Sequence, residues 1–324
     1  MRIVSLLPSA TEIICSLGLE EQLVGVTHEC DWPESVLSLP KVTRTLIPAD
    51  ASSAEIDRLV REKLGDNSAL YSLDMEALEK LKPDLIVTQA LCDVCAVAEE
   101  EVNAAACALP GRPGVVNLEP ESLREVIDCI ALVADAAGVP ARAARVMDEL
   151  TRRADSVAER SRSIPQHPRA MLLEWIDPPF SCGHWSPELV EMAGAMEGIG
   201  RPGVKSRRCD WREILEWNPE VLMIACCGMG VERTLQDIPI LQSYERFSEL
   251  QCTRDDRVYV MDGAAYFSRP GPRLVDSLEI LANALHPDVH PLPGRLPRAT
   301  RVHPQGDRAP VTGSPRPARG SAPH

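Results

Sequence analysis

Cysteine and histidine side chains stand in close pairs at four places in this sequence. Each pair lies just past a segment that is predicted to be a buried strand. Thiolate and imidazole groups bind transition metals, and paired thiols also perform redox chemistry. The spacing therefore predicts a metal site with six candidate ligands: His28, Cys30, Cys92, Cys95, Cys182 and His184. The fourth pair is Cys226 and Cys227.

Each of these pairs has a simpler interpretation. Cys92-x-x-Cys95 has the spacing of a redox pair or of half a zinc site, but two small buried thiols fit the same pattern. The His28 and His184 pairs are also compatible with packing alone. Eleven cysteines, an odd number, favour a reducing compartment over a secreted disulfide framework.

Large aromatic side chains gather in the same loops. Only 12 of the 324 residues are Phe, Trp or Tyr, yet these loops hold Trp32, Phe180, Trp185, Tyr266 and Phe267. Aromatic walls with a few polar groups suit a large, flat, apolar ligand, although they can also complete a core. Arg269 either pairs with an amide or phosphate of such a ligand or caps the final helix.

Strand and helix patterns alternate along the chain, which predicts an α/β fold with mostly parallel sheets. Ligands of such folds bind outside the carboxyl ends of the strands. Ser9, with Glu12 three residues later, has the spacing of a helix capping box. The predicted strands are Arg2–Leu6, Leu23–Val26, Asp84–Thr88, Val115–Leu118, Arg169–Trp175, Val221–Ala225 and Arg257–Met261.

One long helix is predicted between Val139 and Ser163. It begins at Pro140, and only Val146, Leu150, Ala154 and Val157 form an apolar stripe. We therefore expect two Rossmann-like lobes that are joined by this helix, touch little elsewhere and enclose a ligand cleft. A surface helix of one larger domain is the alternative. The expected divisions are a lobe over 1–138, the helix over 139–164, a lobe over 165–287 and a disordered tail over 288–324.

The charge of the chain bears on its partners. The net charge is −14, while residues 291–324 carry six Arg and one Asp, so the rest of the chain is more acidic still. An acidic body argues against nucleic acid as a partner. No run approaches the roughly 18 apolar residues of a membrane span. We expect a monomer without membrane insertion, and we expect the tail, with eight Pro in its last 34 residues, to be disordered.

The first residues, MRIVSLLPSATEI, contain no long apolar stretch followed by a small-residue cleavage site. As written, the chain is therefore expected to be cytoplasmic. A true start further upstream would make it periplasmic or a cell-surface protein.

Five segments together carry a resemblance to a known family. They are RIVSLLPSATEIICSLGLEEQLVGVTHECDWP, LKPDLIV, EWIDPPFSCGHWSPELVEMAGA, NPEVLMI and YFSRPGPRLVDSLEILANALHP. In this order they resemble vitamin B12-binding substrate-binding proteins of ABC transporters, which belong to the helical-backbone receptors for cobalamin, iron–siderophore and haem. The resemblance covers about residues 1–287 and implies two lobes, a backbone helix, a corrinoid or metal chelate in the cleft, an ABC permease as partner and no enzymatic activity.

The resemblance also assigns roles to single residues. Trp32, Phe180, Tyr266 and Phe267 match aromatic positions that face the ligand in that family. Glu76 matches an acidic residue that pairs with permease arginines, whereas the corresponding position in the second lobe falls on Arg212, next to Glu213. The Cys and His pairs are not part of the family pattern.

Two functional hypotheses follow. The first is binding of cobalamin or a related corrinoid, whose cobalt takes an axial ligand that His28 or His184 would supply. The second is a cytoplasmic metal-binding or thiol redox protein that uses the Cys/His cluster. The sequence contains no Walker loop, no G-x-S-x-G and no H-E-x-x-H, which argues against an enzyme.

Overall fold

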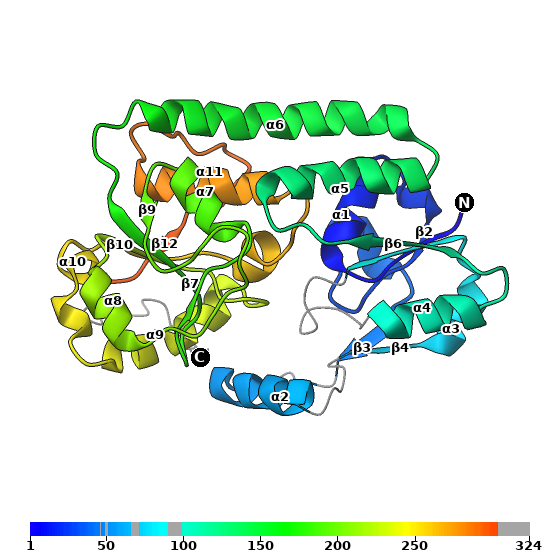
Figure 1. The fold of residues 1–324 in the computed structure, drawn as a ribbon, viewed down its shortest axis with the longest axis horizontal. Coiled ribbons are helices and arrows are strands. Elements are labelled where there is room, and N and C mark those ends of the chain that lie inside the picture. Colours follow the sequence, from blue (N-terminus) through cyan, green and yellow to red (C-terminus); the bar gives the residue numbers. More distant parts are fainter. Residues whose placement is uncertain (46, 49–50, 66–70, 90–98, 304–324) are drawn as a thin grey trace, which may run out of the picture.

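The computed structural model describes residues 1–45, 47–48, 51–65, 71–89 and 99–303. Two groups of strands lie side by side beneath one long helix, α6 (Figure 1). No strand pairing joins the two groups within the described residues. The predicted α/β fold with two lobes and a backbone helix is confirmed.

The N-terminal lobe contains a four-stranded parallel sheet in the order β2-β1-β5-β6. Most residues of its strands are apolar, as expected where helices cover both faces. The strands are β1 (Ile3–Ser5), β2 (Leu23–Gly25), β5 (Leu85–Gln89) and β6 (Gly114–Leu118), with β3 (Thr43–Thr45) and β4 (Tyr71–Leu73) forming a separate antiparallel pair. The helices are α1 (Pro8–Ser16), α2 (Ser53–Gly65), α3 (Met75–Leu81), α4 (Glu99–Ala108) and α5 (Leu123–Ala136).

The C-terminal lobe contains a six-stranded sheet in the order β12-β11-β10-β7-β8, with β9 paired to β7. β10 is parallel to both of its neighbours, β7 and β11. The strands are β7 (Arg169–Trp175), β8 (Phe180–Ser181), β9 (Met196–Glu197), β10 (Val221–Ile224), β11 (Val258–Val260) and β12 (Thr300–Arg301). The helices are α7 (Ser186–Met192), α8 (Trp211–Trp217), α9 (Val231–Ser243), α10 (Gln251–Arg254) and α11 (Leu274–Leu285).

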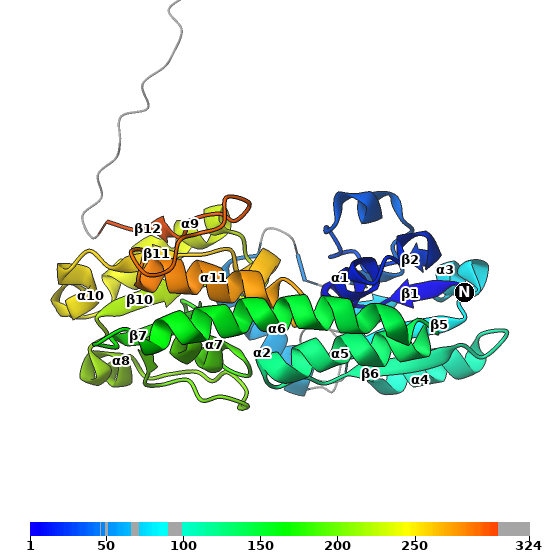
Figure 2. The same cartoon turned by 90° about the horizontal axis from the view of Figure 1, so that it is seen from above.

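Helix α6 (Pro140–Arg162) runs along both lobes (Figure 2). Its 23 residues span about 35 Å at the α-helical rise. Leu150, Ala154 and Val157 are buried, while most of the other side chains face solvent. One buried cluster includes these three residues and extends from the first sheet through α5 and α11 to the second sheet. The helix therefore shares a core with both lobes.

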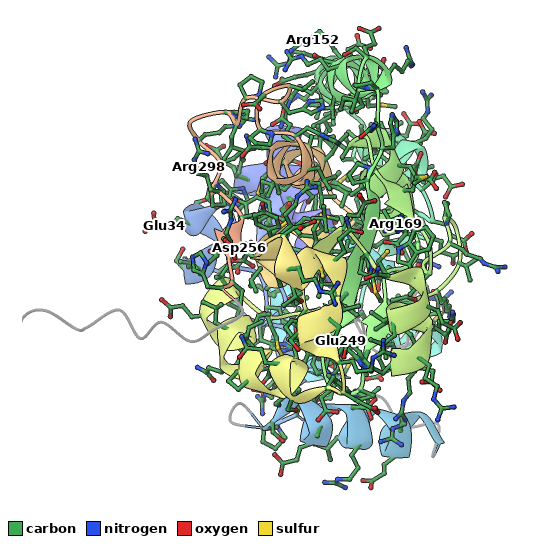
Figure 3. All side chains as sticks on the ribbon, turned by 90° about the vertical axis from the view of Figure 1, so that its left-hand side faces the viewer. Glu34, Arg152, Arg169, Glu249, Asp256 and Arg298 are labelled. Atoms are coloured by element: carbon green, nitrogen blue, oxygen red, sulfur yellow. The ribbon has the colours of Figure 1, made fainter. Side chains whose placement is uncertain are left out.

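The lobes also touch directly outside α6, through a small number of side chains. Helix α2 lies on the open side between the lobes in Figure 1 and beneath the C-terminal lobe in the end view of Figure 3. Its Ser53 hydroxyl donates to Asp237 of α9, and Arg233 donates to the same hydroxyl at 3.3 Å. Ile56 packs against the second lobe's core. This contact joins two segments that no local sequence pattern links.

The predicted disorder of the tail is wrong for residues 288–303. β12 pairs antiparallel with β11, Leu296 is buried, and the side-chain amide of Asn283 donates to the His290 carbonyl at 2.8 Å. The edge of β11 offers backbone groups that a returning segment satisfies, which composition alone does not reveal. Residues 304–324 lie outside the described part of the chain.

Ending the chain at Pro287 is therefore expected to lower its melting temperature relative to ending it at His303. The shorter form loses the β11–β12 pairing and the burial of Leu296, which alone is worth about 2 kcal/mol. Calorimetry of the two truncated forms checks this. Equal melting temperatures would show that residues 288–303 add nothing to stability.

Candidate ligand-binding cleft

A cavity of about 300 Å³ lies between the two lobes. Ser9 and Gln89 line it from the N-terminal lobe, and Cys227 and Ser268 line it from the C-terminal lobe. A smaller cavity of about 90 Å³ shares Gln89, Cys227, Ser268 and Pro270 with it. The two cavities thus form one cleft. It lies at the carboxyl ends of β5 and β10, where ligands of α/β folds bind.

The cleft presents polar atoms that have no hydrogen-bond partner among the described residues. These atoms are Ser9 Oγ and Gln89 Oε1, and His184 Nδ1 beside the smaller cavity. Buried polar atoms are paired in the great majority of cases, so unpaired ones mark places where a ligand or water completes the bonding. Ser9 lies in the first turn of α1, whose N-cap is Leu7, so the predicted capping role of Ser9 is wrong.

The charge of the cleft is negative in its described part. Glu29 and Asp31 line the larger cavity, and Glu174 lines the smaller one. Arg269 is the one Lys or Arg among the described lining residues. Its guanidinium is bound by Asp31 at 2.5 and 3.0 Å and by Glu12 at 3.5 Å. Arg269, predicted to contact the ligand, is thus already engaged by carboxylates of the other lobe.

These ion pairs tie the two lobes together. Arg273 donates to Glu12 Oε1 at 2.6 Å, and Glu12 is buried. Burial opposes ionisation of Asp31, but hydrogen bonds and charge from Arg269 and charge from Arg273 lower the pKa of Asp31 overall. Four charged side chains from two lobes therefore form one network beside the cleft.

The predicted aromatic wall is only partly assembled. Trp185 and Phe267 line the smaller cavity, where the Trp185 indole donates to the Phe267 carbonyl at 3.0 Å. Trp32 is 51% exposed and lies beside Asp31. Arg273 stands 5.1 Å from the Trp32 ring and 5.5 Å from the Tyr266 ring. Phe180, in β8, does not line either cavity.

The predicted metal ligands are not gathered at one point. Cys30 is buried within the first lobe near the hydroxyls of Thr11 and Thr27, and Cys182 is buried within the second. Burial raises the pKa of both thiols, as expected for small side chains used in packing. Within the described residues, no three His, Cys, Asp or Glu side chains are placed to hold a metal ion. Cys92 and Cys95 lie outside the described part.

The two histidines of the predicted set differ in position. His28 shares a hydrogen bond of 2.8 Å between its Nδ1 and Thr43 Oγ1, and it does not line the cleft. His184 does line the smaller cavity and stacks on Trp185. Burial lowers the pKa of both rings. His184 is therefore the only one of the four described candidate ligands that lines the cleft.

The predicted permease-contacting residues lie on outer helices of different lobes. Glu76 of α3 is 78% exposed at its side chain and pairs with Lys80 at 2.5 Å. Glu213 of α8 belongs to a capping box with Asp210 and binds Arg207 at 2.5 Å, and these bonds lower the pKa of Glu213 to about 2. Arg212 beside it is exposed. The Glu213 carboxylate thus remains charged at neutral pH.

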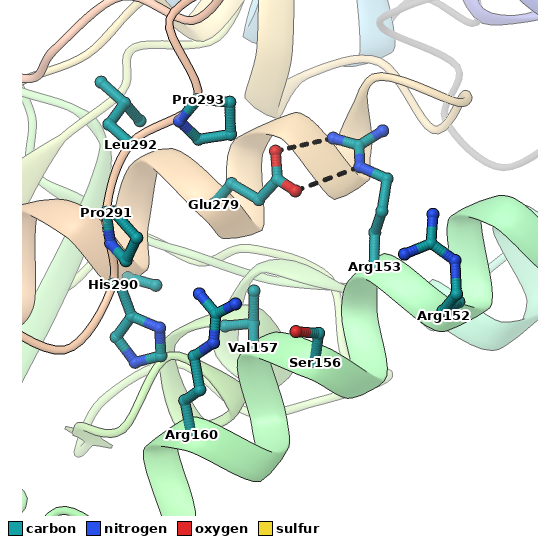
Figure 4. Close-up of a pocket in the computed structure, with 11 residues that line it drawn as sticks. Arg152, Arg153, Ser156, Val157, Arg160, Glu279, His290, Pro291, Leu292 and Pro293 are labelled. Atoms are coloured by element: carbon teal, nitrogen blue, oxygen red, sulfur yellow. Dashed lines mark hydrogen bonds and ion pairs between the residues drawn. The ribbon is translucent and has the colours of Figure 1, made fainter.

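A second site, away from the cleft, is a cavity of about 380 Å³ between α6, α11 and the segment that follows α11 (Figure 4). Arg153, Arg160 and Glu279 line it, and Arg153 binds Glu279 at 2.7 Å across it. No Phe, Trp or Tyr is among its described lining residues. A flat apolar ring finds no aromatic surface there.

Sequence reasoning missed Gln89 and Glu12 as residues of this region. Gln89 is the last residue of β5, so the rule that ligands bind at strand ends would have identified it. No comparable signal exists for Glu12, whose partners lie 257 and 261 residues further along the chain.

Comparisons with known proteins agree with this architecture. A relative, the uncharacterized ABC transporter substrate-binding lipoprotein YvrC of Bacillus subtilis, is 23% identical over 304 residues, covering 89% of this chain and 81% of that one. The periplasmic heme-binding protein RhuT from Roseiflexus sp. RS-1 has 22% identity and a TM-score of 0.66 over 88% of this chain and 98% of its own. The periplasmic vitamin B12 binding protein BtuF of Vibrio cholerae has 20% identity and a TM-score of 0.63 over 88% and 96%.

In the described part of the chain, no helix has both the length and the apolarity to cross a membrane. Residues 3–265 match the model of the family described as periplasmic binding protein. This match covers most of the chain and includes α6, the N-terminal lobe and the C-terminal lobe as far as residue 265. The chain belongs to the periplasmic binding protein family.

Proposed function

We propose that this protein binds cobalamin or a related corrinoid in the interlobe cleft, as the substrate-binding component of an ABC uptake system. Membership of the periplasmic binding protein family and the name of the B. subtilis relative support the transport role. The similar structures include a vitamin B12 binding protein and heme-binding proteins, so a large flat metal chelate is the class of ligand to consider.

The charge of the cleft favours a corrinoid over haem. Haem carries two propionate carboxylates, whereas the corrin ring edge of cobalamin carries neutral amides. Glu29, Asp31 and Glu174 line the described cleft, and its one guanidinium is already paired. Like charges placed together at an interface cost several kcal/mol, so the propionates are disfavoured. Amides instead match unpaired polar atoms such as Ser9 Oγ and Gln89 Oε1.

The thiol redox alternative has less support. A redox or metal-binding cysteine needs an accessible thiolate, and Cys30 and Cys182 are buried with raised pKa values. The Cys92 and Cys95 pair lies outside the described residues. A zinc or iron–sulfur centre in purified protein that takes up no corrinoid would restore this alternative.

Transport also implies a location and a partner. The relative from B. subtilis is named as a lipoprotein, and we propose that this protein acts in the periplasm or at the cell surface as a monomer. Its outer carboxylates, Glu76 and Glu213, are the candidate contacts for an ABC permease.

Titration with aquocobalamin, haemin and haemin dimethyl ester tests the choice of ligand. Corrinoid binding is expected at micromolar concentration, with haemin at least about tenfold weaker, a difference of roughly 1.4 kcal/mol. The ester keeps the ring but removes both carboxylates, so it should bind more tightly than haemin if charge is the reason. Haemin binding more tightly than aquocobalamin would reject the proposal.

A further inference from the structure

Cys227 lines both cavities of the cleft. β10 is flanked on both sides by parallel strands in the second sheet, as is β5 in the first. Gln89 ends β5, and Cys227 lies three residues past the end of β10. Both line both cavities, although they come from different lobes. The inner strands of the two sheets therefore direct these two residues to the same space.

The backbone after β10 separates two adjacent thiols. Cys226 is 1% exposed, and burial raises the pKa of its thiol to about 12. Cys227 is exposed, and its backbone N–H donates to the Glu174 carbonyl at 2.9 Å. Gly228 then takes a φ of +69°, which glycine adopts without strain, and its N–H donates to Ser268 Oγ at 3.3 Å. This turn buries Cys226 and leaves Cys227 facing the cleft.

Buried polar atoms without a partner near Cys227 are an independent feature that points to a ligand here. Gln89 is only 6% exposed, and its Oε1 has no hydrogen-bond partner among the described residues. Ser9 is also buried, and its Oγ likewise has no partner among these residues. Of the four residues that line both cavities, Gln89, Cys227, Ser268 and Pro270, Cys227 carries the only sulfur or imidazole donor. Such soft donors bind transition metals well.

We propose that Cys227 faces the metal of the bound chelate and coordinates it through its thiolate. This inference rests on the function proposed above and identifies Cys227 as the residue that coordinates the cobalt. With aquocobalamin, a Co–S bond forms and the Co–OH₂ bond breaks. Water leaves, the thiol proton passes to solvent, and cobalt stays in the Co(III) state. The ring amides then fall near the polar groups of the surrounding wall.

Absorption spectra of the full-length, reduced protein with aquocobalamin test this coordination. Wild type should shift the corrinoid spectrum, and Cys227→Ser should bind, as followed by tryptophan fluorescence, without that shift. Cys226→Ala and Cys107→Ser are matched controls and should keep the shift, because Cys226 is buried and Cys107 lies on α4. Alkylation of Cys227 by N-ethylmaleimide, read by mass spectrometry, should be blocked by aquocobalamin, while Cys107 stays reactive.

The outcomes separate this inference from the proposed function. Uptake of aquocobalamin by wild type with an unshifted spectrum overturns thiolate coordination alone. A shift that survives in Cys227→Ser but is lost in His184→Gln also overturns it, because His184 then supplies the axial ligand. No uptake by any variant overturns the proposed function and this inference with it.

Discussion

Replacing Glu12 by alanine is expected to lower the free energy of unfolding by about 3 kcal/mol, because it leaves buried charge without its partner. Glu12 Oε1 accepts from Arg273 at 2.6 Å and from Arg269 at 3.5 Å. Arg269 keeps Asp31, but Arg273 loses its only ion-pair partner among the described residues. These contacts join α1 of one lobe to the segment before α11 of the other, so the lobes should also lose mutual support.

Chemical denaturation measures this loss, and calorimetry should show a broader or divided transition as the lobes uncouple. Glu76→Ala is the control, since it removes an exposed ion pair, and such pairs are worth about 0–1 kcal/mol. Glu12→Gln keeps the shape of the side chain and should retain part of the stability. If Glu12→Ala is no more destabilising than Glu76→Ala, the network does not hold the lobes together.

The same network predicts a pH dependence. The pKa of Asp31 is lowered from its ordinary value of 3.8 in the folded protein. Its contribution to stability is therefore present above that pH and is lost as the pH falls through the lowered value.

Trp32→Ala is expected to weaken corrinoid binding by nearly a hundredfold. Trp32 is 51% exposed, so a flat ring can cover about 100 Å² of it. At about 25 cal/mol per Å², this area is worth on the order of 2.5 kcal/mol. The ring stands beside Arg273 of the other lobe, and Trp32 follows Asp31 of the cavity wall in the chain, so the ring lies close to the cleft.

Isothermal titration with aquocobalamin gives the affinity, and the melting temperature of the free protein shows whether the fold is intact. Leu132→Ala is the matched control, because Leu132 is 52% exposed but lies on α5. It should leave affinity unchanged. Equal affinities for Trp32→Ala and wild type would remove Trp32 from the binding surface.

The sequence by itself determined the long helix and seven of the strands, β1, β2, β5, β6, β7, β10 and β11, in their order along the chain. Apolar runs bounded by turn residues located strands such as β5 and β10, and Pro140 with a narrow apolar stripe located α6. These signals are local, since burial and helix periodicity are recorded in neighbouring residues. The rule that ligands bind at strand ends then placed the cleft between the lobes.

Only the tertiary structure decided which strand-exit residues face the cleft. Cys30 and Cys182 follow strands as Cys227 does, but their side chains turn into the cores. A residue type and its spacing do not fix that direction, because it depends on the turn and on packing from distant segments. The sequence predicts that Arg269 binds the ligand or caps the final helix, whereas its partners in the structure are two carboxylates more than 230 residues away. Contacts between residues so far apart produce no repeating pattern in the sequence. They can therefore be identified only in the tertiary structure.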